Sequence, residues 1–227
     1  MNRFSTLIPA SSLVISCQAY APNPLRDSGV MALMARAAEL GGAAGIRANG
    51  VADVAAIAAV VSVPVIGIDK VGTDGVFITP DAETALRLFA AGARIVAMDG
   101  TLRHRPNGRS LAEEVRRIRD GSDGAVMADV DSLAAGIRAA ESGVDAVATT
   151  LSGYTVENVP LEPDIELIAV LASRIDLPVI AEGRIRTRAD VAAARDAGAH
   201  AVVVGTAVTN PLAQTAHLLG ALPAAAR

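Results

Sequence analysis

Eight short apolar runs, rich in Val and Ile, recur along the chain. Each is followed by a longer Ala- and Leu-rich stretch in which apolar positions return with helical spacing. The runs cover residues 13–19, 45–47, 64–69, 94–99, 125–130, 146–151, 178–182 and 201–205. Eight buried strands that alternate with helices indicate a parallel sheet, and eight such units close into a barrel. We therefore predict an α/β protein, a single (β/α)8 TIM barrel.

An open, doubly wound sheet is the alternative for alternating strands and helices. That architecture usually has fewer strands, and its dinucleotide-binding form carries a GxGxxG motif after the first strand, which this sequence lacks. A repeat of Gly followed by a small residue also favours the barrel. Gly42, Gly92, Gly143 and Gly198 precede every second strand, at spacings of 50, 51 and 55 residues. We expect each of them to end a helix in the left-handed conformation.

Local signals mark several helix starts. Ser110-x-x-Glu113 has the spacing of a capping box, in which two side chains satisfy free backbone N–H groups. Pro80 and Pro211 are each predicted to occupy the first position of a helix, where a missing N–H costs nothing.

The composition and length of the chain indicate a single globular domain. The 227 residues suit a single barrel, and no linker or low-complexity run divides them, so we predict one domain over 1–227. The chain is 52% hydrophobic but only 2% aromatic, and its net charge is −4. With acids and bases interspersed and few stacking residues, nucleic acid is not expected as a partner.

The N-terminal residues and the single cysteine indicate the cellular compartment in which the protein is expected. Residues before Cys17 resemble a short lipoprotein signal, but we interpret them as the first buried strand, without which the barrel would open. The longest apolar run, 54–68, is interrupted by Ser62 and Pro64 and is too short to cross a bilayer. One cysteine excludes an internal disulfide framework. We expect a cytoplasmic protein with no membrane partner.

Polar and small residues gather where the predicted strands end. In TIM barrels, the carboxyl ends of the strands carry the active site. One such residue alone could merely cap a strand in solvent, but residues of this kind at all eight ends favour a site. They are Gln18, Arg47, Asn49, Asp69, Lys70, Asp99, Asp129, Thr149, Thr150, Glu182, Gly205 and Thr206. We count Thr150 among the expected substrate contacts.

Lys70 and Glu182 stand out within this set. They follow strands three and seven, which are diametrically opposite in a ring of eight, so their long side chains converge from opposite walls. Two proton-handling groups on opposite faces of one carbon are what a stereochemical inversion requires. The alternative is a structural ion pair across the mouth. Burial and nearby cations would lower the pKa of Lys70, whereas the acids Asp129 and Glu182 would raise it.

The loops after strands seven and eight predict a phosphate site. TIM barrels often hold phosphate there, on backbone N–H groups. The residues are Gly183 and Arg184 in one loop and Gly205 and Thr206 in the other, and Arg184 offers bidentate hydrogen bonds. No His, Cys and acid cluster has the spacing of metal ligands, so no metal is expected.

An ordered set of motifs along nearly the whole chain carries a family resemblance. The motifs are Ile15-Ser16-Cys17-Gln18-Ala19, Gly45-Ile46-Arg47-Ala48-Asn49-Gly50, Pro64-Val65-Ile66-Gly67-Ile68-Asp69-Lys70, Ile78-Thr79-Pro80, Arg103-His104-Arg105-Pro106, Met127-Ala128-Asp129, Thr149-Thr150-Leu151-Ser152-Gly153-Tyr154-Thr155 and Ile180-Ala181-Glu182-Gly183-Arg184-Ile185. Together they resemble N-acetylmannosamine-6-phosphate 2-epimerases. Gly100, where the family usually has Ala, departs from the pattern but removes no reactive group.

The resemblance implies interconversion of N-acetylmannosamine 6-phosphate and N-acetylglucosamine 6-phosphate, in sialic acid and amino-sugar catabolism. It implies a homodimer and no metal or organic cofactor. By the same resemblance, Lys70 and Glu182 are the catalytic pair, and Gln18, Arg47 and Asp129 hold or orient the substrate.

Two other functions stay open at this point. A lysine at a strand end could form a Schiff base, as in aldolases that act on phosphorylated substrates. The chain could also be a sugar-phosphate sensor without catalysis, although binding alone would not need both Lys70 and Glu182.

Overall fold

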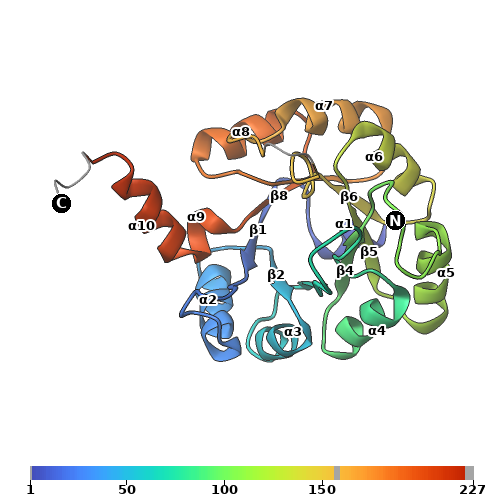
Figure 1. Cartoon of the computed structure of the whole chain (residues 1–227), viewed down its shortest axis with the longest axis horizontal. Helices are drawn as coiled ribbons and strands as arrows, with labels where there is room; N and C mark the ends of the chain where they lie inside the picture. Colours follow the sequence, from blue (N-terminus) through green and yellow to red (C-terminus); the bar gives the residue numbers. More distant parts are fainter. Residues whose placement is uncertain (1, 156–158, 223–227) are drawn as a thin grey trace.

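The barrel predicted from the apolar runs is confirmed. The computed structural model describes residues 2–155 and 159–222, and its eight parallel strands follow one another in chain order around a closed barrel (Figure 1). The strands are β1 (Ser12–Cys17), β2 (Gly45–Asn49), β3 (Val65–Ile68), β4 (Ile95–Asp99), β5 (Ala125–Asp129), β6 (Ala146–Ala148), β7 (Val179–Glu182) and β8 (Ala201–Val204). The largest departure is in β6, which ends at Ala148 and not at residue 151. Strand β2 extends past Arg47 because Ala48 and Asn49 pair with β3.

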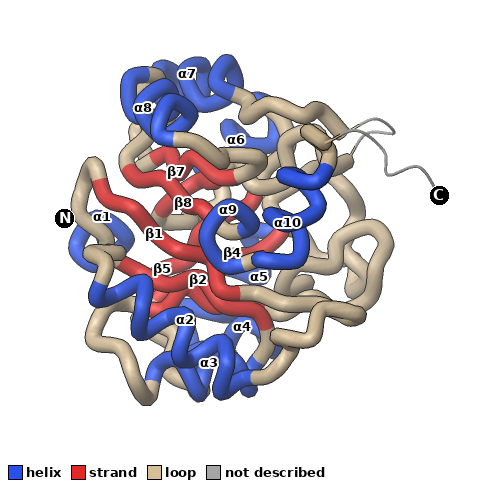
Figure 2. Tube along the Cα trace, turned by 90° about the vertical axis from the view of Figure 1, so that its left-hand side faces the viewer, coloured by secondary structure: helices blue, strands red, loops and turns tan. Residues whose placement is uncertain are grey.

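The described residues also form helices, most of which lie around the outside of this barrel. They are α1 (Arg3–Leu7), α2 (Ser28–Leu40), α3 (Val51–Ala58), α4 (Ala82–Ala90), α5 (Leu111–Gly121), α6 (Leu133–Ala140), α7 (Ile165–Arg174), α8 (Arg188–Asp196), α9 (Thr206–Thr209) and α10 (Pro211–Leu219). Figure 2 shows α7 and α8 on one side of the strands and α2 and α3 on the other. No helix within 2–155 and 159–222 is long and apolar enough to span a bilayer.

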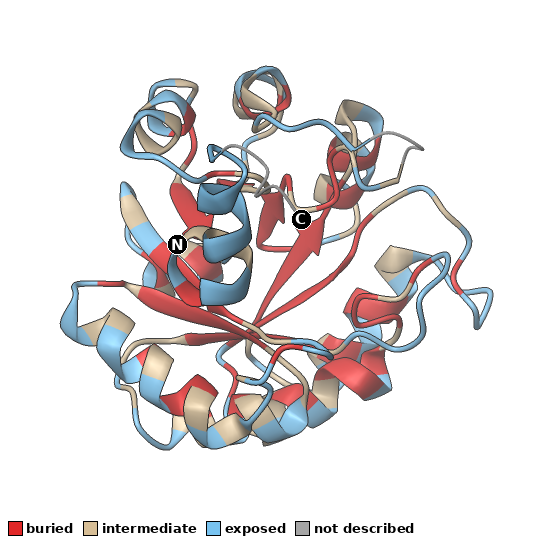
Figure 3. Cartoon of the chain, turned by 60° about the vertical axis from the view of Figure 1, so that its left-hand side comes forward, coloured by how far each residue is buried: buried red, intermediate tan, exposed pale blue. Residues whose placement is uncertain are grey.

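Alternate residues of each strand face two different cores. In β3, Ile66 and Ile68 belong to the core inside the barrel, whereas Val65 belongs to the core under the helices. Gly67 also faces outward, where a Cβ atom would lie only 3.3 Å from that of Leu88 in α4, so glycine permits this helix to approach closely. Phe4 of α1 is fully buried in the inner core. Figure 3 shows the buried strands and the exposed outer faces of the helices.

The local signals are confirmed with one exception. Ser110 and Glu113 form the predicted capping box, and Pro211 is the first residue of α10. The prediction for Pro80 is wrong. Helix α4 begins at Ala82, because the Asp81 carboxylate accepts the backbone N–H of Thr84 and so takes the N-cap position itself.

The repeated glycines have the expected conformation. Gly42, Gly92, Gly143 and Gly198 have φ angles of 98°, 108°, 85° and 98°. Each lies just after a helix, so the repeat marks helix ends that turn the chain into β2, β4, β6 and β8.

Candidate active site

The carboxyl ends of the strands surround a cavity of about 410 Å³. Strand closure brings together predicted site residues as far apart in the chain as Gln18 and Thr206. Eight of the ten predicted site residues line it, namely Gln18, Lys70, Thr150, Glu182, Gly183, Arg184, Gly205 and Thr206. The other two, Arg47 and Asp129, are not in the lining and lie buried inside the barrel.

Arg47, Asp129 and Glu182 form a buried ionic cluster. All three belong to strands, and they continue the inward-facing series of alternate positions. Arg47 is only 1% exposed, and its Nη2 lies 2.6 Å from Asp129 Oδ2 while its Nη1 lies 2.9 Å from Glu182 Oε2. One guanidinium therefore holds two carboxylates from β5 and β7 in fixed positions. Its Nε has no hydrogen-bond partner within the described residues.

Burial and neighbouring charges both act on the pKa values of Arg47 and Glu182. Burial works against the charge of Arg47, but Asp129 and Glu182 outweigh it and raise the guanidinium pKa. Burial raises the pKa of Glu182 to about 7; Asp129 acts in the same direction, and Arg47, Thr150 and Lys70 oppose it. Near neutral pH, Glu182 is thus present both as an acid and as a carboxylate, as a proton-transfer group requires.

Thr150 connects the two carboxylates. Its Oγ1 lies 2.8 Å from Asp129 Oδ1 and 3.0 Å from Glu182 Oε2. A hydroxyl carries only one proton, so it donates to one carboxylate at a time. When Glu182 is protonated, it donates to Thr150, which in turn donates to Asp129. The hydroxyl of Thr150 is therefore bound to the acidic cluster, which the sequence did not indicate.

Lys70 enters the cavity two residues after β3. Its backbone N–H donates to Asn49 Oδ1 at 3.1 Å, and it pairs with Ile78 in an isolated antiparallel bridge. Among the described residues Lys70 forms no salt bridge, and Glu182 pairs with Arg47 instead. The structural ion pair left open by the sequence is therefore absent from this part of the chain.

The surroundings of Lys70 favour its neutral form. Burial lowers the pKa of the amine first, and the positive charge of Arg47 lowers it further. The negative charges of Glu182 and Asp129 act in the opposite direction but do not cancel these effects. A lysine with a lowered pKa is a more available base near neutral pH.

The predicted phosphate loops face the same cavity. Gly183 and Arg184 both have positive φ angles, 111° and 60°. The Arg184 guanidinium already donates to loop carbonyls, from Nε to Glu162 at 2.7 Å and from Nη1 to Ser152. Three of its five N–H groups remain for an anion, so a bidentate contact would use Nη1 and Nη2. Gly205, which follows the neighbouring strand β8, is the N-cap residue of the short helix α9.

Sequence reasoning missed Tyr20 of the site, whereas Tyr154 lies in one of the motifs that carry the family resemblance. The chain has two tyrosines and three phenylalanines, and both tyrosines line this cavity. The Tyr20 ring lies against Lys70, and the Tyr154 ring lies 5.4 Å from Cζ of Arg184. Lys70 is also the only lysine beside 19 arginines. The rarity of both residue types was a signal that could have identified them.

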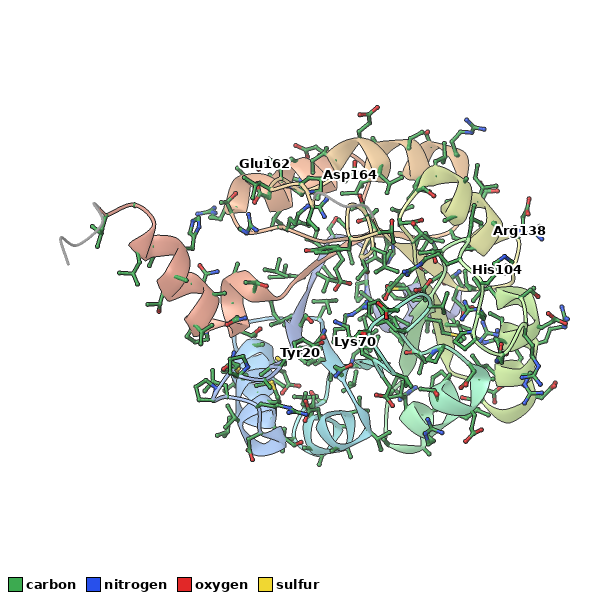
Figure 4. The ribbon with its side chains drawn as sticks, in the orientation of Figure 1. Tyr20, Lys70, His104, Arg138, Glu162 and Asp164 are labelled. Carbon is green, nitrogen blue, oxygen red and sulfur yellow. The ribbon has the colours of Figure 1, made fainter. Side chains whose placement is uncertain are left out.

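The motif that contains His104 lies outside this cavity. His104 lies away from Tyr20 and Lys70 and lines a separate cavity with Arg138 (Figure 4). Across 2–155 and 159–222, no group of three or more His, Cys, Asp or Glu side chains is placed to hold a metal ion.

Comparisons with known proteins agree with one another. Residues 31–222 match the family model described as "Putative N-acetylmannosamine-6-phosphate epimerase". Two curated relatives carry the name "Putative N-acetylmannosamine-6-phosphate 2-epimerase". The one from Cutibacterium acnes is 50% identical over 98% of this chain and 100% of its own. The one from Caldanaerobacter subterraneus is 46% identical over 88% and 86%.

Solved structures show the same likeness in three dimensions. The structure of the N-acetylmannosamine-6-phosphate 2-epimerase from Clostridium perfringens superposes with a TM-score of 0.91. It is 38% identical, and the match covers 96% of both chains. An orotidine 5'-phosphate decarboxylase from Pyrococcus horikoshii, at 17% identity and a TM-score of 0.61 over 88% of this chain and 92% of its own, shares the fold alone.

Proposed function

The chain belongs to the N-acetylmannosamine-6-phosphate epimerase family, and we propose that it interconverts N-acetylmannosamine 6-phosphate and N-acetylglucosamine 6-phosphate. It is then an isomerase of amino-sugar and sialic acid catabolism, acting through one catalytic domain over 1–227. The observation that supports this function is that Lys70 and Glu182, which follow and end two opposed strands, line the same cavity. Family membership favours neither the aldolase nor the sensor.

The reaction begins from the open-chain sugar, whose C1 aldehyde makes the C2 proton removable. The neutral Lys70 amine takes that proton, and the electrons of the C2–H bond form a C1–C2 double bond with the charge on O1. Protonated Glu182, or a water bound to it, then returns a proton to the opposite face of C2, and the C1 carbonyl re-forms. The lowered pKa of Lys70 and the raised pKa of Glu182 suit these two roles.

The remaining site residues hold the substrate and the acid in place. Gly183, Arg184, Gly205 and Thr206 bind the phosphate on C6, which anchors the far end of the substrate and so positions C2 for reaction. Gln18 binds the sugar near Lys70.

Arg47, Asp129 and Thr150 act through Glu182, because all three contact or surround its carboxylate inside the barrel. Thr150 also lines the cavity and can contact the sugar there. No metal or organic cofactor takes part in this mechanism.

Epimerisation in heavy water tests the function. Bases that exchange with solvent return deuterium, so we expect every inverted product molecule to carry deuterium at C2, measured by proton NMR. The unphosphorylated sugar is the matched control, and its kcat/KM should be far lower because it lacks the phosphate contacts. Inversion at C2 without deuterium, in an enzyme whose bases exchange quickly, would show that C2 is not deprotonated.

A homodimer, in the cytoplasm, completes the proposal. Helix α10 extends from the barrel, and none of its residues is buried (Figure 1). Its leucines are exposed, Leu212 by 54% and Leu219 by 59%. Beside α8 and β8, a second cavity of about 500 Å³ has apolar residues such as Val191 and Val208 in its lining. An exposed apolar helix and an open apolar groove on one chain are complementary in a symmetric pair.

Charges on α10 should separate the two subunits. Leu212 and Leu219 are seven positions apart, which places them on one helix face. We expect the double variant Leu212→Glu, Leu219→Glu to sediment as a monomer where the wild type sediments as a dimer. Leu102→Glu, at a leucine that is 61% exposed in the β4–α5 loop, is the control and should stay dimeric. A double variant of unchanged mass would place the interface elsewhere.

A further inference from the structure

One aromatic ring lies against the only lysine of the chain. Tyr20 is in the loop after β1, and its ring centroid is 4.7 Å from Nζ of Lys70. Figure 4 shows the two side chains next to each other at the barrel mouth. A cation within about 6 Å of a ring centroid and over its face is attracted by the electrons of that face. Tyr20 therefore interacts with the protonated form of Lys70 and not with the neutral amine.

The ring is held in this place by the end of β1. The Tyr20 hydroxyl donates to Oε1 of Gln18, and Nε2 of Gln18 donates to Oγ of Ser16 at 2.6 Å. Burial raises the pKa of Tyr20 to about 12, so the phenol is neutral near pH 7 and adds no negative charge. Tyr20 therefore interacts with Lys70 through the face of its ring.

We propose that Tyr20 is a positioning residue for Lys70, whose ring face holds the protonated amine against the cavity wall. The catalytic role of Tyr20 in this proposal rests on the proposed epimerase function. The charged groups facing Lys70 from the surrounding strands are Arg47 on β2, Asp129 on β5 and Glu182 on β7. Tyr20 adds an interaction from the β1 side.

The consequence for the reaction follows from the change in charge. Lys70 is neutral before it takes the C2 proton and positive afterwards. The contact with Tyr20 thus forms as the proton arrives, and it stabilises the intermediate and the transition state that leads to it. In the reverse direction the same contact holds the ammonium that returns the proton.

Titration of the single lysine measures this contact directly. Protein grown with lysine labelled with carbon-13 at Cε gives one lysine signal, because Lys70 is the only lysine. Tyr20→Leu keeps an apolar side chain but removes the ring, so we expect the Lys70 pKa to fall by about half a unit. Tyr20→Phe keeps the ring and should titrate within about 0.2 units of the wild type.

Tyr154→Leu is the matched control, since it removes the other tyrosine of the same cavity, the one beside Arg184. It should leave the Lys70 titration unchanged. The proposal is overturned if Tyr20→Leu leaves the Lys70 pKa unchanged or raises it. It is also overturned if Tyr20→Phe or Tyr154→Leu lowers that pKa as much. Tyr20→Met provides a second ring-free variant if Leu disturbs the loop, which circular dichroism would reveal.

Kinetics supply the second measurement. Loss of the ring contact should lower kcat about two- to five-fold in Tyr20→Leu, with KM little changed, because the contact develops as the proton is transferred and is absent when the substrate first binds. A rise in KM with unchanged kcat would instead make Tyr20 a substrate contact and overturn the positioning role. If the wild type shows no exchange at C2, the proposed function fails, and the Lys70 titration still decides whether Tyr20 holds the amine.

Discussion

Lys70→Met is expected to reduce kcat/KM by a factor of about 10²–10⁴, the usual contribution of a general base. Methionine keeps the length and apolar stem of lysine but has no group that can take a proton. Lys70 lines the cavity and forms no salt bridge within the described residues, so the fold should be unaffected. Steady-state kinetics and circular dichroism measure the two effects. Turnover within a few-fold of the wild type would exclude Lys70 as the base.

Lys70→Arg is the matched control for charge. Arginine keeps the positive charge and the contact with the Tyr20 ring, but it does not lose its proton near neutral pH. If Lys70 served only as a cation, this variant would stay active; as a base, it should lose as much activity as Lys70→Met.

Residual C2 exchange in heavy water then separates the roles of the two groups. The epimer that still exchanges in Lys70→Met is the one whose C2 proton faces Glu182.

Arg47→Met is expected to destabilise the fold by about 3–5 kcal/mol, because it leaves buried carboxylates without their counter-charge. Arg47 is 1% exposed and contacts both Asp129 and Glu182. Chemical denaturation monitored by circular dichroism measures the change. Arg87→Met is the control, since the pair of Arg87 with Glu83 is exposed and should cost at most about 1 kcal/mol. Equal losses in the two variants would contradict the importance of the buried cluster.

The loss in Arg47→Met should depend on pH. Burial has already raised the pKa of Glu182 to about 7, and Arg47 opposes this shift. Without Arg47 the pKa of Glu182 rises further above its unfolded value. Such a group favours folding while it is protonated and loses that contribution as pH rises through its folded pKa. We therefore expect the destabilisation to be largest above about pH 7 and to shrink towards about pH 5.

Much of the fold was readable because its signals are local. Apolar runs mark the strands, and left-handed glycines such as Gly92 mark the helix ends. Once eight units are counted, closure alone places Lys70 and Glu182 on opposed strands. Pro80 shows the limit of such reasoning, because the neighbouring Asp81 takes the N-cap and moves the start of α4. Where two neighbouring residues could each begin a helix, the backbone conformation in the folded protein decides which of them does so.

The sequence by itself determined the barrel, the order of its strands and eight of the residues that line its mouth. Only the tertiary structure decided which of them touch. Arg47 and Asp129 are 82 positions apart and meet because strand closure and register bring two inward-facing positions together. Tyr20 contacts Lys70 because of the path of the loop after β1, and hydrophobic periodicity does not predict the path of a loop. Likewise, Pro211 predicts the start of helix α10, but only the tertiary structure shows that this helix extends from the barrel with none of its residues buried. Periodicity specifies the direction of a side chain, whereas a contact requires two distant segments to be placed in space.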